Sequence, residues 1–495
     1  MRKDSDLSGL LPLPVRTTKP EMVIVSPDTP MDTAREFLQR QCQRGGAMIV
    51  LYWQGEFWRW NGMYYVPEDE LIMEGHISKF LYDAYKWVKG GNAVRFQPTP
   101  RNVKDVLFFL KTGLALGVEY QPPMWLDTCE RGTEWIAFRN GVVNVLTGEE
   151  KKPSPNLWIH SALPFDWDPK APCPLWLKFL EEVFPEDVES QDFIEEWLGY
   201  CMTEETRFQK AAMFIGERRS GKSTISHVMQ QLVGAGSYIG LDFSNWTANE
   251  NSRQPLIGKR AGVFADVRLK PGKFYGQTYD RGGLSHTSVG LLLNITGEDF
   301  VTVPRKFIGE WRGVLRLKLT LISNEVPNLN DAGGVLPSRF VKVRFGVSFE
   351  GREDKTLKDK LDGELSGIAA NCIYAYRRLC ERGDLGGFVQ PETANALERS
   401  VLAASDPFAA MALECFVPDP EGTVVKTKAY EVFEGWCRVN GHRDIFRTTK
   451  DNAFGNKLKL IGGFERIIST RPLDPTTGLQ GPRVWQGMRL RKKGE

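Results

Sequence analysis

Residues 216–224 carry the clearest chemical pattern in the chain. They read Gly-Glu-Arg-Arg-Ser-Gly-Lys-Ser-Thr and directly follow the apolar run 211–215. The pattern G-x-x-x-x-G-K-[ST] after a strand predicts a loop that wraps phosphates, with glycines for close approach and backbone N–H groups aimed at the anion. Lys222 is expected to reach the β- and γ-phosphates, and the Ser223 hydroxyl to bind Mg²⁺. The residues predicted to bind ATP are Gly216, Glu217, Arg218, Arg219, Ser220, Gly221, Lys222, Ser223 and Thr224.

Three polar residues farther along the chain suit a site that hydrolyses ATP. The strand expected at 256–266 ends in Asp266, which can hold Mg²⁺ through water, although an ordinary acidic residue at a strand end is the alternative. A second expected strand, 317–323, is followed by Asn324, which can orient the attacking water or sense the γ-phosphate. Arg339 precedes a further strand and can act on a neighbouring subunit's nucleotide as an arginine finger. The predicted catalytic residues are Lys222, Asp266, Asn324 and Arg339, and the predicted metal ligands are Ser223 and Asp266.

The general base is left open by the sequence. Asp266 stands alone at its strand end and is followed by Val267 and Arg268. Glu298 or Asp299 is a candidate only if folding brings it near the loop.

Composition excludes several classes of protein. The chain has 495 residues, which favours about three domains, and a formal net charge of only +2, so any surface for nucleic acid must be a local patch. The eight cysteines show no C-x-x-C spacing and the five histidines are dispersed, which argues against a zinc site or a disulfide framework. No apolar run reaches membrane-spanning length, and the first residues lack the apolar core of a signal peptide. A cytoplasmic location without a membrane partner is therefore expected.

The predicted organisation is α/β with flanking domains. Residues 48–66 are rich in Tyr and Trp and predict small β-hairpins, whose aromatic side chains we expect in a core rather than stacked on bases. The expected boundaries are a flexible tail at 1–35, an α+β domain at 36–165, a helical connector at 166–210, an α/β core at 211–345, a helical lid and linker at 346–422 and a terminal domain at 423–495.

The C-terminal segment has its own pattern. Residues 427–437 and 452–461 predict two helices, and 464–469 and 484–490 predict two strands, which together suggest a winged helix. The segment is locally basic through Lys450, Lys457, Lys459, Arg466, Arg471, Arg483, Arg489, Arg491, Lys492 and Lys493. We expect Lys457 and Lys459 to contact duplex DNA through its phosphates, and a solvated basic face is the alternative.

The order of these motifs resembles the superfamily III helicases, and more specifically the phage and plasmid primase–helicase family of AAA+ ATPases. The region before the loop, with Arg139-Asn140-Gly141 and Pro164-Phe165-Asp166-Trp167-Asp168-Pro169, looks like the domain that precedes the helicase core in that family. Thr296-Gly297-Glu298-Asp299, Asn324-Glu325-Val326-Pro327 and Ser338-Arg339-Phe340 are similar to its later motifs. Glu353 to Ile368 looks like its helical lid.

The resemblance implies a ring, a hexamer in the family's manner, with ATP bound between subunits and single-stranded DNA in a central channel. Arg305 and Lys306 follow a Pro-bearing turn where related motors place a DNA-gripping hairpin, and a solvated surface pair is the alternative. The chain departs from the family in lacking paired carboxylates at the metal strand and a primase domain before residue 150. A separate primase or other replication proteins are therefore possible partners.

Three functions remain open at this point. The first is a replicative DNA helicase of a phage, plasmid or mobile element with an AAA+ core, an N-terminal α+β domain and a C-terminal winged helix. The second is an AAA+ loader or remodeller that hydrolyses ATP without unwinding. The third is a nucleotide-switched origin-binding protein that acts mainly through the basic C-terminal segment.

Overall fold

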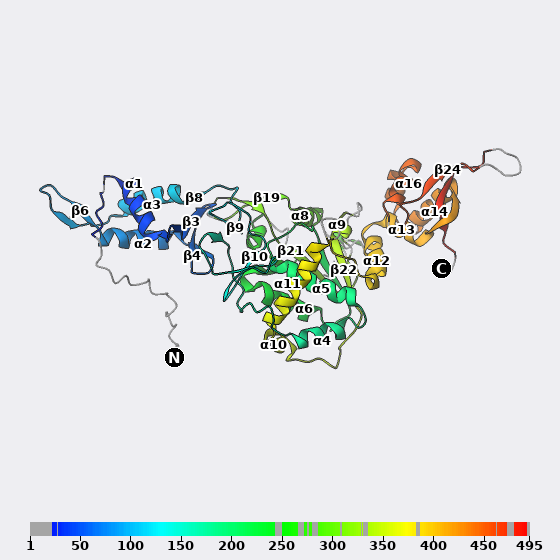
Figure 1. Cartoon of the computed structure of the whole chain (residues 1–495). Coiled ribbons are helices and arrows are strands. Elements are labelled where there is room, and N and C mark those ends of the chain that lie inside the picture. The colour runs from blue at the N-terminus through cyan, green and yellow to red at the C-terminus, as the bar shows by residue number, and fades with distance from the viewer. Residues whose placement is uncertain are drawn as a thin grey trace. The chain divides into compact units, whose positions relative to one another are not determined.

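The computed structural model divides the chain into two compact units, one of residues up to 61 with 66–117 and one of 62–65 with 118–495 (Figure 1). It describes residues 22–26, 28–242, 250–265, 272–274, 277–279, 286–306, 309–327, 329, 335–382, 387–461, 463–472 and 480–492. In this part of the chain no helix is long and apolar enough to cross a membrane.

The first unit combines three helices with a small sheet. The helices are α1 (Pro30–Gln41), α2 (Glu70–Asp83) and α3 (Pro100–Leu114). The sheet has the order β5-β4-β3-β8, with strands at Tyr65–Glu68, Glu56–Trp60, Val50–Trp53 and Ala115–Leu116. A second, two-stranded sheet pairs β6 (Tyr85–Trp87) with β7 (Ala93–Arg95).

Local sequence explains where these helices begin. The Asp69 side chain accepts a hydrogen bond from the Leu71 amide at the start of α2, and Thr99 forms a capping box with Asn102 at the start of α3. Packing begins before residue 36, because Val25 is buried and α1 starts at Pro30. The ordered unit therefore extends into the segment that we expected to be a tail.

The aromatic segment 48–66 forms the antiparallel hairpin β3–β4 and then β5. Trp53, Phe57 and Tyr65 are buried, and the Tyr65 hydroxyl donates to the Pro155 carbonyl over 2.7 Å. These three rings belong to the interior, as aromatic residues at strand spacing usually do.

The second unit begins with short strands that precede the central sheet. They are β9 (Met124–Trp125), β10 (Trp135–Phe138), β11 (Gly141–Asn144), β12 (Glu150–Lys151) and β13 (Leu157–Trp158), followed by α4 (Pro174–Val183) and α5 (Val188–Met202). Phe138 and Val143 belong to the same hydrophobic cluster as Trp197 and Ile225. The boundary expected at 165 is thus replaced by one near 117, because 118–165 shares its core with the rest of the unit.

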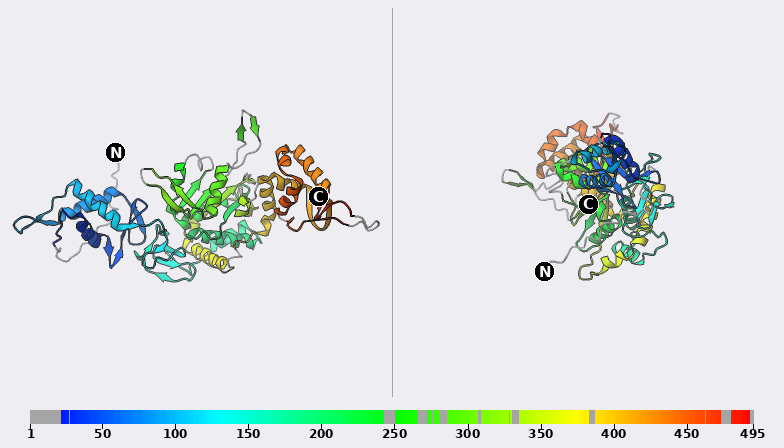
Figure 2. Two further views of the ribbon diagram at one scale, coloured as in Figure 1. Left: turned by 90° about the horizontal axis from the view of Figure 1, so that it is seen from above. Right: turned by 90° about the vertical axis from the view of Figure 1, so that its left-hand side faces the viewer.

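The central sheet consists of five parallel strands in the order β15-β16-β21-β14-β22. The strands are β14 (Ala211–Gly216), β15 (Tyr238–Leu241), β16 (Ala261–Phe264), β21 (Lys318–Ser323) and β22 (Phe340–Phe345). Helix α6 (Lys222–Val233) packs against β16, and α5 and α11 (Leu365–Glu381) pack against α6 (Figure 2). The mixed α/β class expected from the sequence is confirmed.

Further elements connect and cover this sheet. The helices are α8 (His286–Thr296), α9 (Val335–Arg339), α10 (Leu357–Asp362) and α12 (Asn395–Ser405). The strands β17 (Gly272–Phe274) and β18 (Gln277–Tyr279) form one antiparallel pair, and β19 (Phe300–Val303) and β20 (Trp311–Val314) form another.

The C-terminal elements pack around one small aromatic core. In order they are α13 (Pro407–Cys415), β23 (Phe416–Val425), α14 (Lys426–Val439), α15 (Arg443–Thr448), α16 (Asp451–Lys459), β24 (Ile468–Thr470) and β25 (Val484–Leu490). The sheet has the order β23-β25-β24 and is antiparallel, and its core includes Phe408, Phe433, Phe454 and Trp485.

Residues 418–422, which we expected to be the end of a linker, lie inside β23. They form an irregularity between Pro418 and Thr423, where the pairing with β25 shifts register. Because α13 contributes Phe408 and Met411 to the same core, this group of elements begins at residue 407 and not at 423.

Candidate nucleotide site

The loop 216–221 joins the central strand β14 to helix α6 and has two glycines that no other residue can replace without movement. A Cβ at Gly216 would lie 2.1 Å from the Phe345 carbonyl oxygen. Gly221 has a φ of +92°, and a Cβ there would lie 2.9 Å from Cγ2 of Val183. The glycines of the sequence pattern are therefore required by close packing and by a left-handed turn.

Lys222 folds its side chain into the loop. Its Nζ donates to the carbonyl oxygens of Gly216, at 2.7 Å, and Glu217, at 2.5 Å, and to Oγ of Ser220, at 3.0 Å. Ser220 Oγ in turn donates to the Glu217 carbonyl over 2.8 Å. The loop thus holds a buried ammonium group inside its curve.

The start of α6 adds to this positive field. The helix begins after Gly221 with no side-chain cap, so its first-turn N–H groups and the positive end of its dipole face the loop. A glycine-bounded loop, a lysine ammonium and an uncapped helix start together fit a phosphate group. Ser223 is the second residue of α6 and Thr224 the third, so both lie directly after the loop, and their binding of Mg²⁺ and ATP stays a prediction.

The outer turn of the loop is fastened to the segment that follows β22. Arg219 adopts a φ of +58°, its carbonyl accepts from the Phe349 amide over 2.9 Å, and its guanidinium pairs with Glu353. The Arg218 carbonyl accepts from Ser348 Oγ over 3.4 Å. Although the side chain of Arg219 is 54% exposed, the backbone contacts hold the turn in place.

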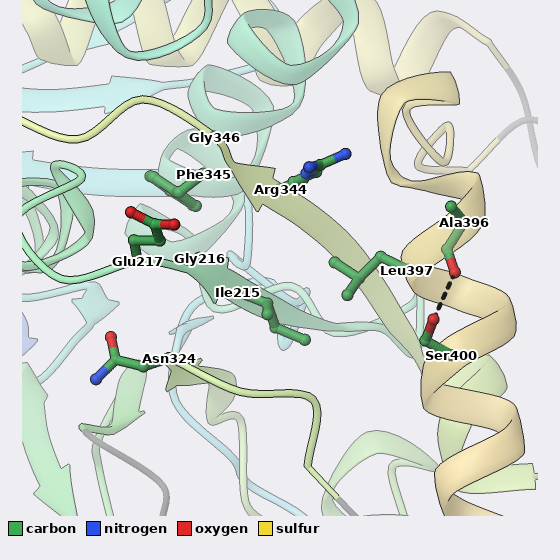
Figure 3. A pocket seen from close by; sticks show the side chains of 10 residues that line it. All are labelled: Ile215, Gly216, Glu217, Asn324, Arg344, Phe345, Gly346, Ala396, Leu397 and Ser400. Atoms are coloured by element: carbon green, nitrogen blue, oxygen red, sulfur yellow. Dashed lines mark hydrogen bonds between the residues drawn. The ribbon is translucent and has the colours of Figure 1, made fainter.

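A cleft of about 330 Å³ opens beside the loop (Figure 3). It is lined by Ile215, Gly216, Glu217, Asn324, Arg344, Phe345, Gly346, Ala396, Leu397 and Ser400. These residues come from the carboxyl ends of β14, β21 and β22 and from α12, so the cleft lies at the edge of the sheet where ligands of open α/β sheets usually bind.

Asn324 is brought to the loop as expected. It follows β21, which pairs directly with β14, and it lines the same cleft as Glu217. Glu217 and Arg344 are the charged residues of this lining, and the sequence analysis singled out neither as a catalytic group. Arg344 could have been noticed in the sequence as a charged residue within a largely apolar strand. In the structure it is the exposed position of β22, whose other residues are buried.

Asp266 lies outside the described residues, so its metal role stays a prediction. The strand that leads to it, β16, ends at Phe264 and is parallel to β21. Because β21 lies between β16 and β14, the strand of Asp266 is the second neighbour of the loop strand and not the adjacent one.

Arg339 lies at the opposite end of the sheet from Lys222. It directly precedes β22, whose Phe340 pairs with Ala211 at the start of β14 and whose Phe345 pairs with Gly216 at its end. Five strand residues span roughly 17 Å. Arg339 therefore does not reach the loop of its own chain.

A small hydrogen-bond network holds Arg339 at that end. Its Nη1 donates to the side chain of Gln209 over 2.6 Å and to the Gln209 carbonyl over 3.3 Å. Nε2 of Gln209 donates to Glu298 over 3.5 Å, and Thr206 Oγ1 donates to the same carboxylate over 2.5 Å. Gln209 has a φ of +51°, which an L-residue adopts only when its surroundings enforce it.

This network changes the view of the general base. Glu298 contacts residues that precede β14, at the edge of the sheet away from Lys222, and Asp299 is its neighbour in the chain. The condition set for these two candidates, that folding brings them near the loop, is not met within one chain.

Arg305 and Lys306 lie in the connection between β19 and β20, so the hairpin expected there is present. Nε of Arg305 donates to the Gly309 carbonyl over 2.9 Å, and Lys306 is exposed. Contact with DNA stays a prediction for both.

Lys457 and Lys459 lie in the last turn of α16. Nζ of Lys457 donates to Thr449 Oγ1 over 3.1 Å and lies 5.4 Å from the centre of the Phe408 ring. Lys459 is exposed. Of the two, Lys459 is the more available for a phosphate.

Comparison with known proteins matches one part of the chain to a family model. Residues 36–185 match the family model described as D5 N terminal like. The match runs from within α1 to just after α4 and includes the region that resembled the domain before the helicase core.

Solved structures of the C-terminal region of NrS-1 resemble the chain over most of its length. One A-form apo structure has 12% sequence identity and a TM-score of 0.48 and covers 88% of this chain and 95% of its own. A second, of residues 305–718, has the same identity and TM-score and covers 92% of this chain and 100% of its own.

Proposed function

We propose that the chain is an ATP-driven replicative DNA helicase of a phage, plasmid or mobile element, which works as a ring and moves along single-stranded DNA. The observation that best supports this proposal is the loop 216–221, which holds the Lys222 ammonium and is followed by a helix without a side-chain cap. The D5 N terminal like region supports the replication setting, since it stands where the resembled family has the domain before its core.

Residue roles follow from this geometry. Lys222 and the first-turn amides of α6 would bind the phosphates of ATP, and Asn324 would orient water in the cleft. Ser223 and Asp266 would hold Mg²⁺, which neutralises charge on the β- and γ-phosphates when bound. Arg339 would complete the site of a neighbouring copy, because it lies at the far end of its own sheet. Such an arrangement requires a neighbouring copy of the chain, and a closed ring of six copies is the form we propose.

The C-terminal elements support a winged helix in this proposal. Their order is helix, strand, three helices and two strands, and the last two strands pair in one three-stranded sheet with the first. A domain of this kind would bind duplex DNA, with Lys459 at the end of α16 near the phosphates.

The direct test is the ATPase rate of Lys222→Ala. Hydrolysis should be abolished while the circular dichroism spectrum and melting temperature stay close to those of the wild type. Lys178→Ala is the matched control, because Lys178 is an exposed lysine on α4 outside the site. A wild-type rate for Lys222→Ala would show that this loop is not the active site.

Strand displacement separates the helicase from the other two functions. A fork with a single-stranded tail should be unwound in the presence of ATP and Mg²⁺ but not by Lys222→Ala. Hydrolysis without displacement would indicate a loader or remodeller, and duplex binding switched by nucleotide without displacement would indicate an origin-binding protein.

A further inference from the structure

Two large aromatic side chains are exposed next to the hairpin β6–β7. Trp87, at the end of β6, is 59% exposed, and Tyr82, near the end of α2, is 55% exposed. In Figure 1 and in the left view of Figure 2 the hairpin extends beyond α2 and α3 of its own unit. Neither ring contributes to the hydrophobic core of that unit, which contains Phe37, Met73 and Leu110.

The register of the hairpin places a cation on the same face as Trp87. Tyr85 pairs with Arg95 and Trp87 with Ala93, so Trp87 and Arg95 lie on the same face of the hairpin. The guanidinium of Arg95 lies 5.4 Å from the centre of the Tyr82 ring. Arg95 therefore shares a hairpin face with Trp87 and also contacts the exposed ring of Tyr82.

The surrounding chain is strongly basic. Residues 79–104 contain Lys79, Lys86, Lys89, Arg95, Arg101 and Lys104 and one acidic residue, Asp83. The formal net charge of these 26 residues is +5. The whole chain has a net charge of +2, so the remaining residues together have a net charge of −3. Within the described residues no ion pair is formed by Lys86, Lys89 or Arg95.

These features match one class of ligand. Every base has a face on which an aromatic side chain can stack, and every nucleotide carries a phosphate that attracts lysine and arginine. In a duplex the bases stack on each other and present only their edges, so a stacking surface requires a single strand. A core role is excluded by the exposure of both rings.

We propose that the hairpin β6–β7 is a binding site for single-stranded nucleic acid. Trp87 and Tyr82 stack on bases, and Arg95 and Lys89 contact the phosphates between them. The site is separate from the ATP loop, and it replaces the stacking role considered for 48–66, where Trp53, Phe57 and Tyr65 are buried.

The experiment measures binding of a fluorescent oligo(dT) by anisotropy, with full-length protein and no nucleotide. Trp87→Ala should weaken binding by roughly five- to 150-fold, the range of one lost stacking contact. Trp87→Phe keeps a ring and should retain most of the affinity. Phe108→Ala is the matched control, because Phe108 on α3 is 61% exposed in the same unit, and it should bind as the wild type.

The phosphate contacts are tested by salt dependence. The double variant Lys89→Ala/Arg95→Ala should reduce the slope of log affinity against log salt by roughly 1.4, since each single-strand phosphate contact contributes about 0.7. Lys178→Ala/Lys358→Ala removes two lysines elsewhere and should leave the slope unchanged. The affinity for an abasic oligomer should be lowered by the double cation variant but not by Trp87→Ala, because this oligomer has phosphates and no bases.

Equal oligo(dT) affinities for Trp87→Ala and Phe108→Ala would overturn the proposal. This result is expected if the exposed rings bind a protein or a lipid instead of nucleic acid. The same conclusion follows if Trp87→Phe binds as weakly as Trp87→Ala, because the effect would then not depend on an aromatic ring. Because the assay omits nucleotide, its failure leaves the ATPase proposal intact, and a failed ATPase test leaves this site intact.

Discussion

Lys222 and Arg339 lie at opposite ends of two adjacent parallel strands, which sets the minimum assembly for the proposed chemistry. Phosphates bound by Lys222, as proposed, would lie about one strand length from Arg339 of the same chain. An arginine can then stabilise the transferring phosphoryl group only in a neighbouring copy. Hydrolysis should therefore depend on protein concentration until the ring has formed.

Arg339→Ala should hydrolyse ATP more slowly by roughly 10³- to 10⁵-fold and still bind it, because an arginine finger acts on the transition state and not on the bound nucleotide. ATP binding is measured with a fluorescent analogue and hydrolysis by phosphate release. Arg316→Ala is a useful comparison, since Arg316 is a half-buried arginine that donates to the Glu204 carbonyl over 3.1 Å and lies outside the proposed site.

Mixing Arg339→Ala with Lys222→Ala tests the action between subunits. A mixed ring contains some interfaces that pair an intact loop with an intact arginine, so part of the activity should return. If mixed rings, confirmed by mass spectrometry, show no recovered hydrolysis, Arg339 does not act in a neighbouring copy.

At the residue level the sequence predicted the site in part. The loop follows β14 and Asn324 follows β21, and each of these positions can be read from the local sequence. The two are adjacent in the structure because β14 and β21 pair directly. Glu217 and Arg344 were not proposed as catalytic, and Glu298 was kept as a conditional candidate for the general base, because the positions of all three depend on which strands are neighbours. That order is decided by long-range packing, which a single sequence does not show.

At the scale of elements, Gln209 connects the hairpin β19–β20 to Arg339. Its amide accepts from Arg339 over 2.6 Å and donates over 3.5 Å to Glu298, which lies in the turn just before β19. Because these two hydrogen bonds link the turn before the hairpin to Arg339, we expect a shift of the hairpin, which carries Arg305 and Lys306, to be passed to the arginine.

Gln209→Leu should lower kcat of ATP hydrolysis by roughly ten- to 100-fold, because a displacement of about 1 Å at a catalytic group has an effect of this size. KM for ATP should stay unchanged, since Gln209 lies at the edge of the sheet away from Lys222. The measurement is steady-state hydrolysis with and without single-stranded DNA, and stimulation by DNA should be lost.

The control for that variant is Gln390→Leu. Gln390 is also a half-buried glutamine, and its amide bonds to the backbone of Lys342 in β22, at 3.0 and 2.8 Å. It should change stability and not kcat per folded molecule. An unchanged kcat in Gln209→Leu, or a raised KM with kcat intact, would contradict the positioning role.

The end of α5 is held by buried cations. Arg260 is 2% exposed, pairs with Glu204 over 2.7 Å and donates to the Met202 carbonyl over 3.2 Å. Lys318 is equally buried and donates to the Thr203 carbonyl, and burial lowers its pKa to about 8. These cations satisfy the last carbonyls of the helix and oppose the negative end of its dipole.

Arg260→Met should lower the free energy of unfolding by roughly 3–5 kcal/mol, because Glu204 and the Met202 carbonyl lose their partner in a largely buried place. Chemical denaturation followed by tryptophan fluorescence measures the loss. Arg139→Met is the control, since the Arg139–Asp166 pair is exposed, and it should change little. Equal midpoints for both variants would show that the buried pair adds no stability.

At the scale of the whole molecule, the sequence indicated the α/β class because β14, β16 and β21 are short apolar runs at the spacing of strands. Domain limits were less predictable. The prolines and the glycine of residues 418–422 favoured a linker, yet these residues lie inside β23, which pairs with β25 more than 60 residues later in the chain. A partner so distant leaves no local signal, so the limit near 407 appears only in the fold.

Two truncations test this limit together with the winged-helix proposal. A chain that ends at residue 406 removes the entire C-terminal core, while one that ends at 422 leaves Phe408, Met411 and Phe416 without the partners they pack against. The chain that ends at residue 422 should aggregate because its apolar helix face is exposed. The chain that ends at residue 406 should remain folded, hydrolyse ATP and bind duplex DNA poorly.

Full-length protein should bind duplex with a steep loss of affinity as salt rises, because phosphate contacts release about 0.9 counterions each. The chain ending at 406 should show a shallower slope, since it lacks the exposed cations of this region, among them Lys459, Arg466 and Lys492. Lys459→Ala in the full-length chain should weaken binding to all duplexes alike and reduce the slope by about 1. Identical affinities and slopes for the full-length and 406 forms would mean that the C-terminal elements do not hold duplex DNA, and the winged-helix role would then be withdrawn while the ATPase of the remaining chain is unaffected.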